Sequence, residues 1–248
     1  MTRLWTAFLT CAGVAALGAP AGANLLTNGN LDLLQDVEIV PGFFLPKPAS
    51  WQNVGLKTVS GPYEDEMSSE PWAGPAPTPV TADGLMNPAP YNTSPDWAVF
   101  FKGFTGTVAN GDLATGHLIQ DVPGTPGALY QLRGWAGAEP NYLGGAEFAI
   151  EFLNDGGGLI GSAVLDLIAA GLKTDNSEPF DYKEYSIESV APAGTATVRV
   201  RATMRDAAGN PAGGGQAFVV DDFVLIPAPA TAAVLGLGAL ATRRRRTR

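Results

Sequence analysis

Apolar and polar residues alternate with a period of two over several stretches of this chain. The clearest examples are Tyr130–Trp135, Glu147–Phe152 and Val198–Arg205. Successive side chains of a β-strand point to opposite faces, so each stretch predicts a strand with one apolar and one largely polar face. Such strands are typical of antiparallel sheets that cover a core on one side. Phe218–Leu225 predicts a further strand near the end of the chain.

Turn-forming residues separate these strands and favour an all-β fold. The 31 Gly and 20 Pro among 248 residues argue against a helical bundle. The clearest turns are Pro123–Gly127, Asn154–Gly158 and Pro192–Gly194. Ser162–Leu172 is open to two interpretations, a strand that ends near Leu167 or a short helix, and we favour the strand. The prediction is one antiparallel β-sandwich over residues 24–226.

Residues 61–96 differ from the rest in composition. They contain eight prolines, six acidic residues and neither Lys nor Arg. A segment so poor in apolar pattern cannot build a core of its own. We therefore expect a long Pro-rich, acidic loop or insertion over the sandwich, not a second domain.

The first 23 residues have the features of a secretory signal peptide. Arg3 precedes the apolar stretch Leu4–Leu17, and an A-x-A cleavage site ends at Ala23. An N-terminal membrane anchor is the alternative, but the apolar stretch is short for a bilayer span of about 20 residues. A lipoprotein attached at Cys11 is a second alternative, and too little apolar sequence precedes that residue. Cleavage after Ala23 by signal peptidase would remove the one cysteine.

The C-terminus combines a short apolar run with a basic cluster. Ala230–Ala241 is apolar and rich in small residues, and an arginine cluster lies within residues 243–248. This order is a stop-transfer pattern with the arginines held in the cytoplasm. Twelve residues of helix span about 18 Å, less than a hydrocarbon core of about 30 Å. The segment therefore suits transient retention in the membrane better than permanent anchoring.

This tail resembles the PEP-CTERM sorting signal of Gram-negative bacteria. The matching residues are Pro227, Ala228, Pro229, the apolar run 230–241, and Arg243, Arg244, Arg245 and Arg246. Ala228 stands where the family usually has Glu. The resemblance implies recognition by an exosortase-type membrane transpeptidase. Cleavage and transfer to the cell surface, the extracellular matrix or exopolysaccharide would follow.

Charge and the scarcity of histidine and cysteine exclude several functions. The net charge of −9 becomes −15 without the two ends, because 9 basic and 24 acidic residues remain. So acidic a domain disfavours nucleic acid as a partner and is compatible with cation binding. One His and one Cys exclude a Cys/His zinc site and a disulfide framework.

Three stretches together resemble the galactose-binding-like jelly rolls, which include several families of carbohydrate-binding modules. Leu25–Asp32 resembles their opening strand and Val220–Leu225 their closing strand. Between them, Leu118–Val122, Gly127 and Tyr130–Leu132 resemble their central strands. The resemblance implies an antiparallel jelly-roll sandwich.

The same resemblance implies a structural Ca²⁺ between the opening and closing strands. Calcium takes six to eight oxygen ligands from carboxylates and carbonyls. The candidate side chains are Asn30, Asp32, Asp221 and Asp222. Adjacent strand residues point to opposite faces, and we favour Asp221 for the interior because Val219 and Phe223 would share its face. The alternative is that these acids cap turns and face water.

Carbohydrate binding needs exposed aromatic rings and polar groups for hydroxyls. The candidate residues are Trp135, Arg133, Trp72, Trp97 and Tyr142. Trp135 and Arg133 share the polar face of their predicted strand, whereas the others lie in or beside predicted loops. The alternative is that Trp135 packs beneath the insertion and that Trp97 and Phe100 belong to the core, since aromatic residues are more often buried.

No catalytic site is predicted. Glu147 and Glu151 share a face, as a glycosidase pair would, but nothing in the sequence supplies the shaped cleft or raised pKa that such a pair needs. We therefore favour cross-strand charge pairing with nearby arginines. His117 could act as a general base, yet no G-x-S-x-G nucleophile motif accompanies it. His117 is expected at the start of a strand.

We therefore expect an exported, non-enzymatic surface protein with a structural or adhesive role. The alternative is a calcium-stabilised carbohydrate-binding module that recognises surface or extracellular polysaccharide. A secreted hydrolase has the least support. The expected partners are signal peptidase, an exosortase-type transpeptidase, polysaccharide and, through the apolar helix at 230–241, transiently the membrane.

Overall fold

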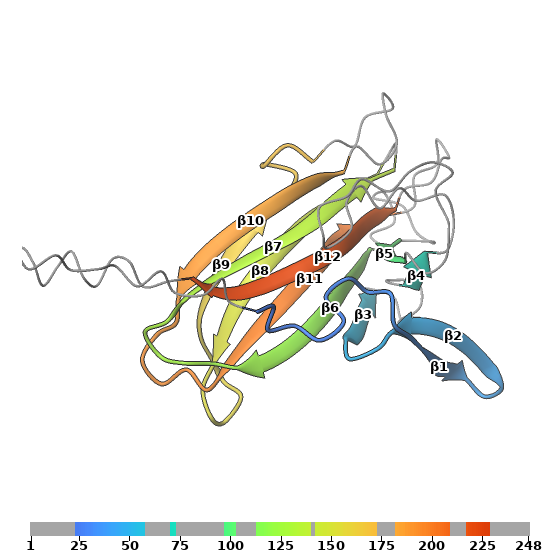
Figure 1. Ribbon diagram of the computed structural model, residues 1–248. Helices are drawn as coiled ribbons and strands as arrows, with labels where there is room; N and C mark the ends of the chain where they lie inside the picture. Colours follow the sequence, from blue (N-terminus) through green and yellow to red (C-terminus); the bar gives the residue numbers. More distant parts are fainter. Residues whose placement is uncertain are drawn as a thin grey trace, which may run out of the picture.

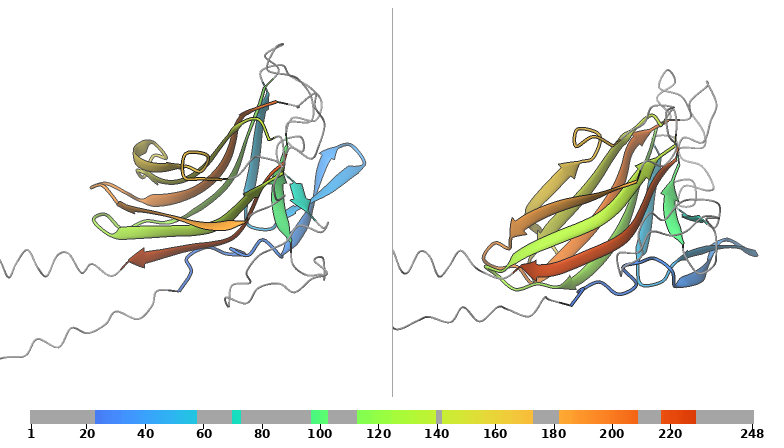
Figure 2. Two further views of the ribbon diagram at one scale, coloured as in Figure 1. Left: turned by 90° about the horizontal axis from the view of Figure 1, so that it is seen from above. Right: turned by 45° about the horizontal axis from the view of Figure 1, so that its top comes forward.

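The protein is an antiparallel β-sandwich with a projecting hairpin (Figure 1). The computed structural model describes residues 23–57, 70–72, 97–102, 113–139, 142–172, 182–208 and 217–228. Within these ranges, twelve strands form two five-stranded sheets and one two-stranded sheet. The two large sheets pack face to face (Figure 2), as the alternating pattern of apolar residues predicts.

We name each large sheet after one of its long inner strands, β7 or β11. The β7 sheet has the order β10 (Lys183–Val190), β7 (Leu129–Ala138), β12 (Phe218–Ala228), β5 (Ala98–Phe101), β4 (Glu70–Trp72). The β11 sheet has the order β3 (Gln52–Lys57), β6 (Ala114–Pro123), β11 (Thr197–Ala207), β8 (Gly145–Leu153), β9 (Leu159–Asp166). The projecting hairpin consists of β1 (Leu34–Val40) and β2 (Phe43–Pro48).

Apolar side chains from the inner faces of both sheets form the core. Leu132, Phe148 and Val200 come from three strands that show the period-two pattern, and all are fully buried. Phe223 of β12 packs against Phe148 at 5.1 Å and against Trp51 at 5.3 Å between ring centroids. The predicted alternation in β7, β8 and β11 is confirmed by their burial.

A β-bulge at Asp222 reverses the alternation of side chains along β12. Asp221 pairs with Trp135 and Val224 pairs with Arg133, so two residues of β12 lie opposite Gly134 alone. Asp222 has a φ of 50°, which is the left-handed conformation that Asp tolerates better than most residues. Phe223 therefore enters the core, whereas Asp221 faces outward beside Trp135. Our expectation that Phe223 shares the face of Asp221 is wrong for this reason.

The opening segment lies beside β12, as predicted, but it is not a strand. Leu25 N–H donates to the carbonyl of Leu225 at 2.8 Å, and Phe223 N–H donates to the carbonyl of Gly29 at 2.7 Å. Between these contacts the chain turns through residues 27–30. Asn28 and Leu31 have φ values of 52° and 58°, and such left-handed residues interrupt a strand.

Other predicted elements differ from the structure in detail. Ser162–Leu172 contains the favoured strand, because β9 ends at Asp166 and a turn follows. The predicted loop 61–96 contains the short strand β4, and its other residues lie outside the described part. β12 continues through Pro227 and Ala228, so the domain boundary after Ile226 falls inside a strand.

The predicted signal peptide and apolar helix fall almost entirely outside the described residues. Ala23 is the first residue described, and residues 229–248 follow the last. Among the residues that the structure describes, no helix is long and apolar enough to cross a membrane. Export and sorting therefore stay predictions from the sequence.

Replacing Gly134 with Ala should destabilise the sandwich. A Cβ at this position would lie 2.6 Å from Cδ1 of Phe223 and 3.1 Å from Cε2 of Phe148. Overpacking a core costs about 1–3 kcal/mol, and urea denaturation would measure it. Gly156→Ala is the matched control, because its nearest contact would be 3.4 Å away. Equal unfolding midpoints for the two variants would contradict the packing described here.

Candidate functional site

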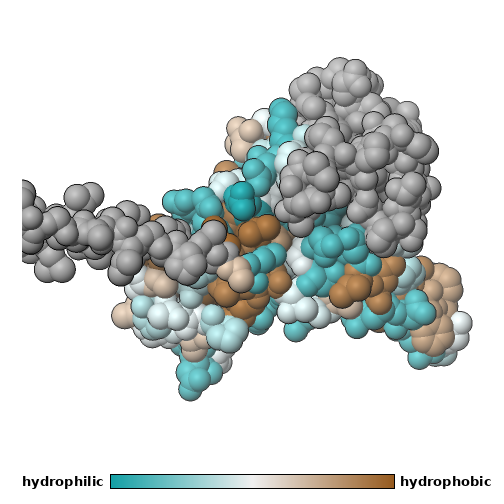
Figure 3. Space-filling view, in the orientation of Figure 1, coloured by the Kyte–Doolittle hydropathy of each residue, from teal (hydrophilic) through white to brown (hydrophobic). Residues whose placement is uncertain are grey.

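The outer face of the β7 sheet presents a row of polar and aromatic side chains. Gln131, Arg133 and Trp135 are partly exposed, and they alternate with buried Leu132 and Gly134. This confirms the predicted facing of Trp135 and Arg133. On the neighbouring strands, Glu184, Glu188, Val224 and Ile226 lie in register with this row. We call these seven residues the β7 face; it lies toward the viewer in Figure 3, where hydrophilic and hydrophobic side chains adjoin.

Trp135 is anchored at its base and partly exposed. Ala98, Tyr182, Ala217 and Val219 form a buried apolar cluster on this side of the sheet, and Trp135 packs against it. A half-buried indole has little rotational freedom to lose when a ligand stacks on it. We predicted that Trp135 is either an exposed platform or a covered side chain; in the structure its exposure is intermediate between the two.

Two cross-strand polar pairs flank the indole. Arg133 Nη1 lies 3.5 Å from Glu184 Oε1, and their side chains are 41% and 43% exposed. Gln131 Nε2 donates to Glu188 Oε1 at 2.7 Å. Exposed pairs of this kind contribute little stability. The pairs hold hydrogen-bond donors and acceptors in fixed positions on the outer face of the sheet, where a ligand's hydroxyl groups could hydrogen-bond to them.

Near Trp135, Asp221 lies close enough to Tyr182 to influence its titration, an interaction that the sequence did not predict. Asp221 is fully buried on the outer side of β12, and its Oδ1 accepts the N–H of Asp222 at 2.7 Å. Burial, and then the charges of Asp221 and Glu139, raise the pKa of the Tyr182 phenol well above its usual value. Tyr182 therefore stays neutral below strongly alkaline pH.

The four predicted calcium ligands lie on neighbouring segments, but their acidic groups do not converge. Asn30 Nδ2 donates to Asp32 Oδ2 at 2.5 Å, and Trp97 N–H donates to Asp32 Oδ1 at 2.8 Å. Asp221 and Asp222 lie in the bulge of β12. Within the described ranges, no three residues among His, Cys, Asp and Glu are placed to hold a metal ion. A calcium site here would depend on carbonyl and amide oxygens, and it stays a prediction.

The remaining predicted ligand-binding residues are not gathered on the β7 face. Tyr142 is buried, donates to the carbonyl of Gly145 at 2.8 Å and packs against Phe218. The expectation of an exposed loop tyrosine is therefore wrong, because its ring fills the core. Trp97 is partly buried beside Asp32. For Trp72, the structure describes only the backbone, which pairs with Ala98.

The outer face of the β11 sheet carries a ladder of ion pairs. Arg201 Nε lies 2.8 Å from Glu151 Oε1, Arg205 Nε lies 2.8 Å from Glu147 Oε1, and Arg199 Nε lies 2.7 Å from Asp121 Oδ1. This is the cross-strand pairing that the sequence suggested for the two glutamates. Carboxylates held by arginines in this way are poorly placed to donate a proton to a leaving group.

His117 belongs to the same face and lies in the middle of β6, not at a strand end. Its Nδ1 is 2.9 Å from Thr203 Oγ1. Burial, and then the charge of Arg201, lower its pKa below the ordinary value of 6.5.

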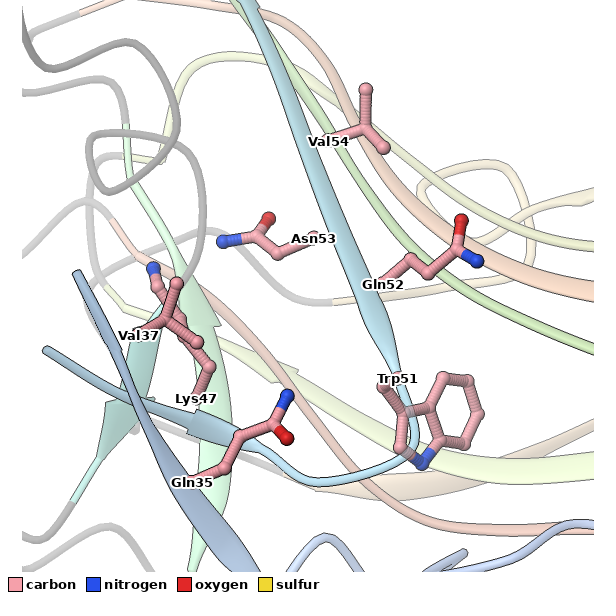
Figure 4. Close-up of a pocket in the computed structure, with 7 residues that line it drawn as sticks. All are labelled: Gln35, Val37, Lys47, Trp51, Gln52, Asn53 and Val54. Carbon is pink, nitrogen blue, oxygen red and sulfur yellow. The ribbon is translucent and has the colours of Figure 1, made fainter. Parts of the chain in front are cut away.

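A pocket of about 330 Å³ separates the β1–β2 hairpin from β3 (Figure 4). Its lining residues are Gln35, Val37, Lys47, Trp51, Gln52, Asn53 and Val54. Trp51 uses its indole N–H to donate to the carbonyl of Asn28 at 2.9 Å and packs on Phe223, so it is a structural residue. The sequence did not predict this pocket, because its strands contain Pro46 and Pro48 and show little alternation.

Replacing His117 with Gln should flatten the acid side of the stability profile. A folded-state pKa below 6.5 means that the folded chain binds fewer protons than the unfolded chain, so stability falls as the pH drops through about 6.5. Urea denaturation between about pH 7.5 and about pH 5 would measure both slopes. His117 is the one histidine of the chain. Equal slopes for the wild type and His117→Gln would contradict the lowered pKa.

Comparison with known proteins supports the fold. No protein-family model matches the chain, and no curated protein matches it. The enzymatically active domain of tailspike protein 4 from bacteriophage CBA120 is 14% identical with a TM-score of 0.50, covering 82% of this chain and 21% of the tailspike chain. The present chain thus spans about a fifth of that protein's length.

Two carbohydrate-binding modules are also similar. TmCBM61, solved with β-1,4-galactotriose, is 16% identical with a TM-score of 0.43, covering 82% of this chain and 98% of the module. The CBM22-1 xylan-binding domain of Paenibacillus barcinonensis Xyn10C is 10% identical with a TM-score of 0.43, covering 86% of this chain and all of the module. At such identities and TM-scores the two likenesses carry no conclusion about function; the all-β antiparallel sandwich is established by the strand pairing itself.

Proposed function

We propose that this chain is a non-catalytic carbohydrate-binding protein that holds polysaccharide along its β7 face. The observation that carries the proposal is the row Gln131, Arg133 and Trp135 on one strand, with a carboxylate of β10 paired to each of the first two side chains. The role that follows is adhesive, because a protein that binds polysaccharide without cleaving it links its attachment point to the glycan.

The chemistry of the β7 face suits a sugar better than an apolar ligand or a polyanion. The C–H groups of a pyranose ring can stack on the partly exposed indole of Trp135. Guanidinium–carboxylate and amide–carboxylate pairs offer donors and acceptors side by side, as vicinal hydroxyls require. Val224 and Ile226 border these pairs on β12 and supply an apolar floor. Two carboxylates on the face would repel a polyanion.

The spacing along β7 is compatible with an extended glycan. Side chains two residues apart on a strand are separated by about 7 Å, so the row from Gln131 to Trp135 extends over about 14 Å. That length accommodates several sugar units. The three side chains would therefore contact different units of one polysaccharide chain, which favours a polymer over a monosaccharide.

Export would bring this face into contact with polysaccharide. The predicted signal peptide and the PEP-CTERM-like tail both direct the chain out of the cytoplasm, and they remain sequence-based proposals. An extracellular matrix of polysaccharide is the setting in which adhesion would operate. The glutamates of the β11 sheet, held by Arg201 and Arg205, give no support for hydrolysis.

Replacing Trp135 with Ala should weaken polysaccharide binding by at least about tenfold, because a central aromatic side chain often dominates the binding energy. Affinity electrophoresis in gels that contain xylan, galactan, mannan or glucan would measure retardation. Phe44→Ala is the matched control, since Phe44 is an exposed aromatic residue on the β1–β2 hairpin.

The proposal expects Phe44→Ala to be retarded like the wild type in the gel that retards the wild type. Arg133→Met should weaken binding as well, because it removes the hydrogen-bond donors beside the indole. Absence of retardation of the wild type in every gel would overturn the proposal. Unchanged retardation of Trp135→Ala would also overturn it.

The export proposal has its own measurement, the intact mass of the protein recovered from its native host. We expect a chain that begins at Asn24 and lacks Arg243–Arg246. Removal of both ends would follow from cleavage by signal peptidase and by an exosortase-type enzyme. A recovered chain that retains the arginine cluster would contradict sorting while leaving the carbohydrate proposal intact.

A further inference from the structure

The strand β9 is an edge strand with an unusual composition. It is the last strand of the β11 sheet, and in the part of the chain that the structure describes no strand pairs with its outer edge. Residues 159–165 read Leu-Ile-Gly-Ser-Ala-Val-Leu, without a charge or a proline. Edge strands normally carry lysines, prolines or inward charges that prevent pairing with another chain. β9 has only Asp166, at its end.

Exposed apolar side chains gather along the same edge. Val164 is 50% exposed and Leu159 is 59% exposed. Ile160, Ile168 of the following turn and Val190 at the end of β10 are exposed as well. Five of the eleven large hydrophobic residues that are exposed in the described ranges therefore belong to β9, its turn and the end of β10. Such a concentration marks an interaction surface.

The edge of the other sheet is protected. β10 is also an edge strand of eight residues, but it contains Lys183, Glu184 and Glu188. Those charges would oppose each other or lose water if a second strand paired there. Charged side chains therefore disfavour strand pairing at β10, whereas β9 lacks such residues before Asp166.

We infer that β9 pairs antiparallel with β9 of a second copy of this chain, forming a two-fold symmetric dimer with a continuous ten-stranded sheet. The regular part of β9 is Gly161–Asp166, because the pairing with β8 is shifted at Leu153. A two-fold axis through Val164, perpendicular to the sheet, places Val164 opposite Val164 of the other copy, so that opposed side chains share a face. This pairing is isologous, so one surface satisfies both partners.

If two copies of this acidic chain associate, the nearly uncharged edge of β9 is the surface where electrostatic repulsion opposes them least. The chain has a net charge of −9, which opposes self-association wherever acidic residues meet. In the proposed register, Asp166 lies opposite Ser162 of the other copy. The two Asp166 residues are then about 14 Å apart along the strand, beyond a screening length of about 8 Å.

The dimer would make the proposed carbohydrate binding bivalent, and this part of the inference rests on the proposed function. A two-fold axis that relates antiparallel edge strands is perpendicular to the sheet, so equivalent faces of the two copies point the same way. Both β7 faces would then address one polysaccharide surface. Two linked sites raise the apparent affinity for a polymer without a new contact.

Val164→Lys tests the inference directly. In the dimer it places two ammonium groups on neighbouring strands, where like charges destabilise pairing. Sedimentation velocity of the full chain, from low to several hundred micromolar, should show a wild-type species of twice the chain mass. We expect the dissociation constant of Val164→Lys to rise at least about tenfold. Its circular dichroism spectrum should be unchanged, and so should its unfolding midpoint at a chain concentration low enough for the wild type to be monomeric as well.

Two controls keep the result specific. Val164→Thr retains a β-branched, uncharged side chain and should dimerise like the wild type. Phe44→Lys alters the exposed tip of the β1–β2 hairpin and should leave the dimer intact. A monomeric wild type at all concentrations would overturn the inference. A dimer that survives Val164→Lys, or one that Phe44→Lys disrupts, would overturn it as well.

Glycan binding separates this inference from the proposed function. In the gel that retards the wild type, Val164→Lys should lose retardation by the polymer but bind a hexasaccharide of the same sugar as the wild type does. Loss of dimer with unchanged polymer binding would overturn bivalence alone. Absence of all glycan binding would overturn the proposed function and leave the β9 dimer to be judged by sedimentation.

Discussion

The bulge at Asp222 is the constraint on which both faces of the β7 sheet depend. A strand without it would keep Phe223 on the outside with Asp221, and the ring that packs against Phe148 and Trp51 would be missing from the core. The hydrogen bond from Phe223 N–H to the carbonyl of Gly29 fixes the bulge against the opening segment. Gly134 makes room for the ring, since any side chain there would collide with it.

The same bulge sets the register of the candidate site. On one side of it Asp221 lies opposite Trp135, and on the other Val224 lies opposite Arg133. The apolar cluster that contains Val219 packs against the indole of Trp135, and the buried Asp221 is the register partner of that residue. The polar pairs of Arg133 and Gln131 with β10 stand beside the apolar side chains of β12. One local irregularity therefore links core packing to the chemistry of the outer face.

The sequence predicted those features that depend on side-chain alternation. The strands around Phe148, Val200 and Leu132 and the outward direction of Trp135 follow directly from a period of two. The bulge did not, because Asp-Asp in a strand gives no signal for a positive φ. The burial of Tyr142 does not follow from the sequence either, because its Gly-rich neighbourhood predicts a loop but not the direction of the ring. The pocket beside β3 depends on how the β1–β2 hairpin packs against the sandwich, and local sequence patterns do not predict such packing.

The most direct measurement is a map of glycan-induced chemical shifts on the isotopically labelled chain. The titrants would be hexasaccharides of xylan, galactan, mannan and glucan. The account predicts that one of them shifts the indole N–H of Trp135 and the side-chain signals of Gln131 and Arg133, while signals of the pocket at Gln35 and Asn53 stay in place. Shifts confined to the pocket, or none with any titrant, would contradict it.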